Sequence, residues 1–200
     1  MRRVFTKALA VTALSAAAAG CFNEPEPAYK SVAEGSRVYL KDMGLADLKG
    51  RSFDASMVDY LNLDRNALTN VDEVASLTGL KWLRLNSNQL SALPPLGELK
   101  SLRRVYLRDN KFSEVPETLK GLPALTDIDL SGNPVSEIPE WLAKKEGLKF
   151  LSFSRTQITK LPDDLSAWKR LKALQLGDLQ MSPAEMARIR KALPDVAVVF

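Results

Sequence analysis

The 200-residue sequence contains no histidine and only one cysteine, Cys21. The absence of histidine removes the usual general base, the Ser-His-Asp arrangement and nearly all zinc sites. A single cysteine permits no disulfide within the chain, and no Gly-rich phosphate-binding loop is present. The sequence therefore predicts a protein that is not an enzyme, with no catalytic residues, no metal and no cofactor.

The chain also lacks an apolar run long enough to span a bilayer near its start. The apolar stretch from Ala8 to Ala19 has about 12 residues, whereas a transmembrane helix needs about 20. It follows the basic residues Arg2, Arg3 and Lys7. A basic start followed by a short apolar stretch predicts a secretory signal peptide over residues 1–20.

The end of this segment, Ala18-Ala19-Gly20-Cys21, resembles the bacterial lipoprotein signal. The resemblance implies lipidation of Cys21, whose acyl chains would attach the protein to a membrane. Ala18 departs from the family pattern, which usually has Leu there, and ordinary cleavage after Ala19 is the alternative. Phe22 stands where inner-membrane lipoproteins tend to have Asp. The resemblance thus implies export to the bacterial cell envelope, as an outer-membrane lipoprotein.

Removal of the predicted signal segment leaves the rest of the chain nearly neutral. Three of the 28 basic residues lie in the signal segment and all 24 acidic residues lie beyond it, so the formal net charge of +4 falls to about +1 after cleavage. This balance gives no indication of a nucleic-acid partner. Residues 21–34 are predicted to comprise the lipidated Cys21 and a polar, proline-containing tether. Residues 35–200 are predicted to form one domain.

From Val58 to Leu179 an apolar pattern recurs every 22 or 23 residues. One copy consists of Leu80, Leu83, Leu85, Asn88 and Leu90, with variable residues between them. This pattern resembles that of the leucine-rich repeat family, and its period lies within the range of that family. The resemblance implies an α/β solenoid, a leucine-rich repeat horseshoe of about six to seven repeats with a parallel sheet on its concave side.

The repeats are weaker at both ends, as expected for the caps of a solenoid. Residues 35–57 are predicted to form a degenerate N-terminal repeat, 58–181 the repeats, and 182–200 a C-terminal cap. The cap should contain a helix over 184–193, N-capped by Ser182, and a strand over 196–200. On the convex side we expect short helical or 3₁₀ segments, since Pro116, Pro139 and Pro162 can each begin a helical turn.

An asparagine closes most copies of the repeat. Its amide can bond the free backbone groups of the turn that follows each strand. Thr156 and Leu179 replace it in the last two copies, so their turns should be closed differently. The predicted structural ladder consists of Asn66, Asn88, Asn110 and Asn133.

The variable strand positions should line up in columns across the concave face, where a partner can bind. The first half of the array is expected to expose aromatic residues interleaved with arginines, and Tyr, Trp and Arg often carry interface energy. The predicted partner-binding residues are Tyr60, Trp82, Arg84, Arg104, Tyr106, Arg108, Asp127, Asp129 and Phe150.

Simpler interpretations of these residues remain open. The aromatics can cover the sheet beside one another, and the arginines can neutralise nearby aspartates. Asp127 and Asp129, two apart on one strand face, could act together or bind a cation, but we expect them to be solvated charges.

Two functions from different classes follow. The first is a non-catalytic, membrane-tethered module that binds a protein partner through its concave face. The alternative is an envelope glycan-binding or peptidoglycan-binding protein, or an adhesin, that uses Trp82, Tyr60 and Tyr106 to stack against sugar rings. A third, purely structural role would leave the concave face without a partner.

Overall fold

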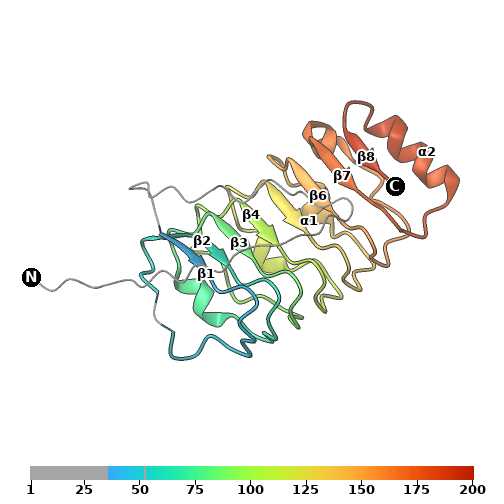
Figure 1. Cartoon of the computed structure of the whole chain (residues 1–200). Helices are drawn as coiled ribbons and strands as arrows, with labels where there is room; N and C mark the ends of the chain where they lie inside the picture. Colours follow the sequence, from blue (N-terminus) through green and yellow to red (C-terminus); the bar gives the residue numbers. More distant parts are fainter. Residues whose placement is uncertain (1–35, 52) are drawn as a thin grey trace, which may run out of the picture. The chain divides into compact units, whose positions relative to one another are not determined.

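The strands of the computed structural model form one parallel sheet in which every strand neighbours the next one along the chain (Figure 1). The structure describes residues 36–51 and 53–200, so the predicted signal peptide, Cys21 and the tether lie outside the described residues. The eight strands are β1 (Ser36–Tyr39), β2 (Val58–Asn62), β3 (Trp82–Arg84), β4 (Arg104–Tyr106), β5 (Asp127–Asp129), β6 (Phe150–Ser152), β7 (Ala173–Gln175) and β8 (Ala197–Val199).

The register of the sheet follows the sequence period. Trp82 pairs with Tyr60 on one side and with Arg104 on the other, and Arg104 pairs with Asp127. Because each coil has nearly the same length, equivalent residues lie at the same height on neighbouring strands, about 4.7–4.9 Å apart. The columns drawn from the sequence are therefore columns of the folded sheet.

The core consists of the apolar repeat positions stacked from coil to coil. Leu61, Leu83 and Val105 have no solvent exposure. In the register of the sheet, Leu83 on β3 is the partner of Leu61 on β2 and of Val105 on β4. No coil can bury these side chains alone, so each is covered by its equivalents in the neighbouring coils. Burial of one such side chain stabilises the fold by about 1.5–3 kcal/mol.

Short helices lie on the opposite side of several coils, as predicted. They are the 3₁₀ helices η1 (Asp72–Ser76), η2 (Glu117–Leu119) and η3 (Ser166–Arg170) and the α-helix α1 (Glu140–Ala143). Pro116 and Pro139 sit at the N-cap, one residue before the first helical position at which we placed them. Their extended ψ angles of 119° and 150° explain the difference, since an N-cap residue is not itself helical.

A helix and a strand end the array. Helix α2 (Pro183–Ala192) is N-capped by Ser182, whose Oγ accepts a hydrogen bond from the Glu185 backbone N–H at 3.2 Å. Strand β8 then pairs in parallel with β7, two residues shorter than the predicted 196–200. The predicted fold class, a parallel solenoid with a helix–strand cap, is confirmed.

Buried asparagine side chains join successive coils. Asn88 Nδ2 donates to the carbonyls of Leu85 in its own coil and Leu63 in the preceding coil, both at 3.0 Å. Its Oδ1 accepts from the Leu68 backbone N–H at 3.1 Å. The amide thus bonds its own turn, as expected, and also the coil before it, which the sequence argument did not include. The same pattern is made by Asn66, Asn110 and Asn133.

Candidate binding surface

We number the positions of each coil from its first repeat leucine, so that Leu80 is at position 1, Trp82 at position 3 and Arg84 at position 5. The outward side chains at positions 3, 5 and 7 of the coils that contain β1–β7 form a surface that we call the strand face. All nine predicted partner-binding residues lie on it. Its third-position column contains Tyr60, Trp82, Arg104, Asp127 and Phe150. Its fifth-position column contains Arg84, Tyr106 and Asp129, and Arg108 lies just beyond β4.

An aromatic cluster occupies the end of the strand face nearest β1. The ring centroids of Tyr39 and Tyr60 lie 5.3 Å apart, and those of Tyr60 and Trp82 lie 5.8 Å apart with an interplanar angle of 61°. This edge-to-face geometry is favourable because the positive edge of one ring meets the negative face of the other. The three rings come from three successive strands and therefore form one continuous group.

Arginine guanidinium groups lie over these rings. Arg104 Cζ is 4.3 Å from the centroid of the Trp82 ring, and Arg84 Cζ is 5.6 Å from that of Tyr106. Arg37 lies 6.0 Å from the Tyr60 centroid. A cation over an aromatic face is attracted by the ring quadrupole. The cluster is thus held by cation–π contacts between strands.

The same arginines also pair with aspartates. Arg84 Nε and Nη2 each lie 2.8 Å from Asp64 Oδ2, and Arg104 Nε lies 3.7 Å from Asp127 Oδ1. Arg108 pairs with Asp109 at 3.2 Å. The simpler interpretation, that the arginines neutralise aspartates on this surface, therefore holds alongside the cation–π contacts. Arg84, Arg104 and Arg108 are thus each paired with an aspartate, and Arg84 and Arg104 also lie over a ring.

Two expectations about exposure were wrong. Asp127 and Asp129, which we expected to be solvated, are only 5% and 7% exposed, and Tyr60 is 6% exposed. Strands in a sheet lie about 4.7–4.9 Å apart, so a short side chain is shielded by longer ones in the same column. Asp127 lies between Arg104 and Phe150. Tyr60 is covered in the same way by its aromatic neighbours.

Burial changes the acid–base properties of this surface. It raises the pKa of the Asp129 carboxyl, although hydrogen bonds from Ser131 oppose the shift. Burial also raises the pKa of the Tyr106 hydroxyl, and the negative charge of Asp127 adds to the effect. Asp129 Oδ1 accepts from the Ser131 backbone N–H at 2.9 Å, so this carboxyl is used to bond its own turn.

Apart from Phe150 on β6, the other half of the strand face is built mostly from smaller residues. Ser131 and Ser152 are buried, and their Oγ atoms lie 2.6 Å apart across neighbouring coils. Ala173, Gln175 and Gly177 continue the columns beyond them. Because large aromatic and arginine side chains are concentrated at the opposite end, that end is the candidate binding surface.

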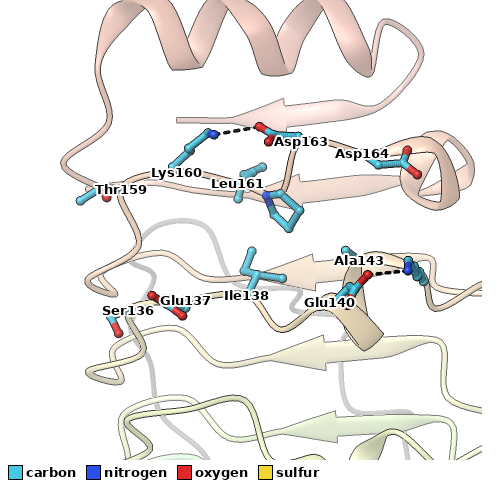
Figure 2. Close-up of a pocket in the computed structure, with 12 residues that line it drawn as sticks. Ser136, Glu137, Ile138, Glu140, Ala143, Thr159, Lys160, Leu161, Asp163 and Asp164 are labelled. Carbon is cyan, nitrogen blue, oxygen red and sulfur yellow. Dashed lines mark hydrogen bonds and ion pairs between the residues drawn. The ribbon is translucent and has the colours of Figure 1, made fainter.

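A groove of about 530 Å³ lies away from the strand face, between residues 136–144 of one coil and 159–164 of the next (Figure 2). Four of its charged residues form two ion pairs, each within one coil. Glu140 bonds Lys144 at 2.5 Å, and Lys160 pairs with Asp163 at 2.8 Å. The sequence argument missed this groove because it forms only when two coils stack.

Within residues 36–51 and 53–200, no group of three or more His, Cys, Asp or Glu side chains is placed to hold a metal ion. None of the helices in this part of the chain has the length and apolar character needed to cross a membrane.

Residues 78–135 match the family model described as Leucine rich repeat. Among solved structures, the chain is similar to a leucine-rich repeat protein of Leptospira interrogans, with 24% identity over 72% of the chain and a TM-score of 0.43. The chain spans about half of that protein, covering 55% of its length. The comparison with curated proteins gives no match.

The stacked repeats, the parallel sheet and the family match together define the fold as a leucine-rich repeat solenoid. Such folds commonly serve as scaffolds that bind other proteins. The same architecture hosts many unrelated ligands, so the site itself has to indicate what this chain binds.

Proposed function

We propose that this protein is a non-catalytic lipoprotein, tethered to a bacterial envelope membrane through Cys21, that binds a protein partner through the aromatic end of its strand face. The observation that supports binding most directly is the packing of Arg104 over Trp82, with Tyr60 against the same ring. Rigid aromatic and arginine side chains that are held in place lose little conformational freedom when a partner binds.

The arginine positions favour a protein partner over a glycan. Sugar rings stack on the open face of an aromatic side chain. Arg104 covers a face of Trp82, and Arg84 lies over Tyr106. What these residues present is a mixed surface of ring edges and charged groups, which resembles the anchor residues of protein interfaces. Glycan binding is therefore the alternative that the experiments below distinguish from protein binding.

The proposed location is the outer membrane. It is supported by the basic start, the short apolar stretch and the Ala18–Cys21 sequence, with Phe22 in place of Asp. Metabolic labelling with a fatty-acid analogue tests it, because wild type should be labelled and Cys21→Ser should not. Fractionation of the labelled protein should recover it with the outer membrane. Equal labelling of both forms would contradict lipidation at Cys21.

Crosslinking and mass spectrometry from native membranes test partner binding. We expect a protein crosslinked to wild type to be lost with the triple variant Trp82→Ala, Arg104→Ala, Tyr106→Ala. Removing Arg104 breaks the Arg104–Asp127 ion pair. A second variant, Trp82→Ala with Tyr106→Ala, therefore retains that pair.

The matched control changes three exposed residues beyond the strand face, Lys111→Ala, Gln157→Ala and Gln180→Ala. It should keep the crosslinked partner, and all variants should be compared at equal abundance. Crosslinks that survive both strand-face variants would contradict the proposal. Sedimentation of wild type with purified cell wall, lost in the strand-face variants, would instead establish the glycan alternative.

A further inference from the structure

A second surface lies at the edge of the sheet where the strands begin. It is made by residues 97–103, 119–126, 144–149 and 165–172, which lead into β4, β5, β6 and β7. These four segments contain nine lysines and arginines but only two acidic residues, Glu98 and Glu146. Because the chain without its signal segment is almost neutral, this imbalance is a local concentration of positive charge.

The backbone aligns part of this charge in a row. Arg103 N–H bonds the Lys81 carbonyl at 2.8 Å, Thr126 N–H bonds that of Arg103 at 2.8 Å, and the ladder continues through Lys149 and Lys172 at 2.7 Å each. These residues occupy one repeat position, so their side chains leave the sheet edge one coil apart, about 4.7–4.9 Å per coil. We call the exposed residues Lys100, Arg103, Lys120, Lys149, Lys169 and Lys172 the basic edge.

The charges of the basic edge differ from those of the strand face in their partners. Among the residues that the structure describes, none of the six makes an ion pair, whereas Arg84, Arg104 and Arg108 on the strand face are all paired. Helix ends account for part of the pattern, since Lys120 caps η2 and Lys169 lies in the last turn of η3. Arg103, Lys149 and Lys172 directly precede β4, β6 and β7. Lys172 also follows the C-cap of η3, whereas Arg103 and Lys149 do not follow a helix cap directly.

The composition of the basic edge indicates the kind of anion that it suits. Five of its six residues are lysines, which are depleted in protein interfaces and act as mobile point charges. The only aromatic residue in the four segments, Trp168, is fully buried, so no ring is available to stack on nucleic-acid bases. A row of flexible point charges fits a fluid surface of phosphate headgroups better than a fixed, shaped partner.

We propose that the basic edge docks on a membrane surface that contains anionic phospholipid. The inference extends the proposed membrane tether and adds an orientation to it. The strands would run away from the bilayer, and the strand face would stand beside it, accessible to a partner from the side. Docking requires neither acylation of Cys21 nor binding at the strand face, so its test can fail or succeed independently of them.

Vesicle sedimentation tests the proposal. The full chain carrying Cys21→Ser, which cannot be acylated at that position, is mixed with vesicles of phosphatidylcholine alone or with added phosphatidylglycerol. We expect sedimentation only with phosphatidylglycerol, and its loss at high salt because the Debye length falls from about 10 Å at 0.1 M to about 3 Å at 1 M. Residues 1–20 are common to every variant, so a difference in binding between variants reports on the substituted residues.

Two variants in the same background locate the binding surface. Arg103→Gln, Lys149→Gln, Lys169→Gln and Lys172→Gln together should lower vesicle partitioning by about tenfold or more, since each basic residue near an anionic surface contributes to attraction. Lys41→Gln, Lys111→Gln and Lys160→Gln, exposed residues beyond the other ends of the strands, form the control and should retain most of the binding. Circular dichroism establishes that both variants are folded.

Equal binding to both kinds of vesicle, no binding, or equal loss in the control would each overturn the proposal. A 30-nucleotide single strand and heparin are tested in parallel. If either binds through the basic edge while vesicles do not, the edge serves a soluble polyanion and membrane docking is wrong.

Discussion

Arg155 Nη2 donates a hydrogen bond to Asp109 Oδ1 at 3.0 Å, although 46 residues and one whole coil separate the two. The side chain reaches across the intervening coil because Gly132 stands there. A Cβ atom on Gly132 would lie 2.2 Å from Asp109 Oδ1. The absence of a side chain at one position therefore permits an ion pair between two others.

Gly132→Ala should destabilise the fold. The backbone φ of Gly132 is +68°, a conformation that costs an L-residue about 1–2 kcal/mol, and the new methyl group would also displace Asp109. We expect a loss of about 2 kcal/mol or more in the free energy of urea unfolding. Gly121→Ala, with no atom within 4 Å of the added Cβ, is the control and should change stability little. Equal effects in the two variants would contradict this explanation.

Asn110→Ala should be costly for a different reason. The side chain bonds the carbonyls of Leu85 and Leu107 and the N–H of Leu90, all of them buried. Each buried polar group without a partner costs about 1–3 kcal/mol, so a loss of about 2–4 kcal/mol is expected. Chemical denaturation checks the value. The exposed Asn70, changed to alanine, serves as a control, and a loss no larger than that of Asn70→Ala would show that the amide is dispensable.

Thr156→Asn should stabilise the protein. Thr156 occupies a ladder position, and its Oγ1 is buried with no hydrogen-bond partner among the described residues. An asparagine there can bond the preceding coil as Asn133 does, for a gain of about 1 kcal/mol. Thermal unfolding should show a higher midpoint than in wild type. Thr156→Val removes the hydroxyl without adding an amide. It therefore separates the stability gained from new hydrogen bonds from the stability gained by removing the buried oxygen.

Glu185 should make stability depend on pH. Its hydrogen bond from Arg188 is the largest cause of a lowered pKa in the folded protein, and the bond from the Leu161 N–H at 2.9 Å adds to it. A lowered folded pKa means that this stabilisation is complete above the ordinary value of 4.5 and is lost as pH falls through the folded value.

The measurement is urea unfolding at pH 7 and at pH 3. Wild type should lose more stability between the two than Glu185→Gln, which keeps a hydrogen-bond acceptor but cannot ionise. Glu140→Gln is the control, because Glu140 is exposed and pairs only along one turn with Lys144. Parallel pH dependence in wild type and Glu185→Gln would contradict the assignment.

Much of the fold could be predicted from the sequence because the repeat period determines both where each strand lies and which residues of the neighbouring strands pair with it. Once Leu83 and Leu85 are placed inward, Trp82 and Arg84 must face outward, and a constant coil length aligns them with Tyr60 and Arg104. The helices that follow Pro116 and Pro139, and the cap, were predicted from local signals. The helical turn expected at Pro162 was wrong, because η3 begins at Ser166, and η1 follows Val71 without a proline.

Exposure and long-range partners could not be predicted in the same way. The burial of Asp127 depends on the sizes of Arg104 and Phe150 beside it, which the repeat pattern does not fix. The Asp109–Arg155 pair depends on a glycine in a third coil. The basic edge was missed although its signal was present, because only the strand positions were aligned in columns. Aligning the position after each first repeat leucine gives Lys81, Arg103, Thr126, Lys149 and Lys172.

The asparagine ladder has a consequence for how the length of this protein can change. Each asparagine amide bonds only its own coil and the one before it. The asparagine of a coil duplicated between β2 and β3 would therefore find the same acceptors, and the coils that follow would move by one strand spacing. The same duplication between Asp109 and Arg155 would move that pair out of reach. Growth and shortening of the array by whole coils should therefore be tolerated in its first half and resisted where the ion pair spans two coils.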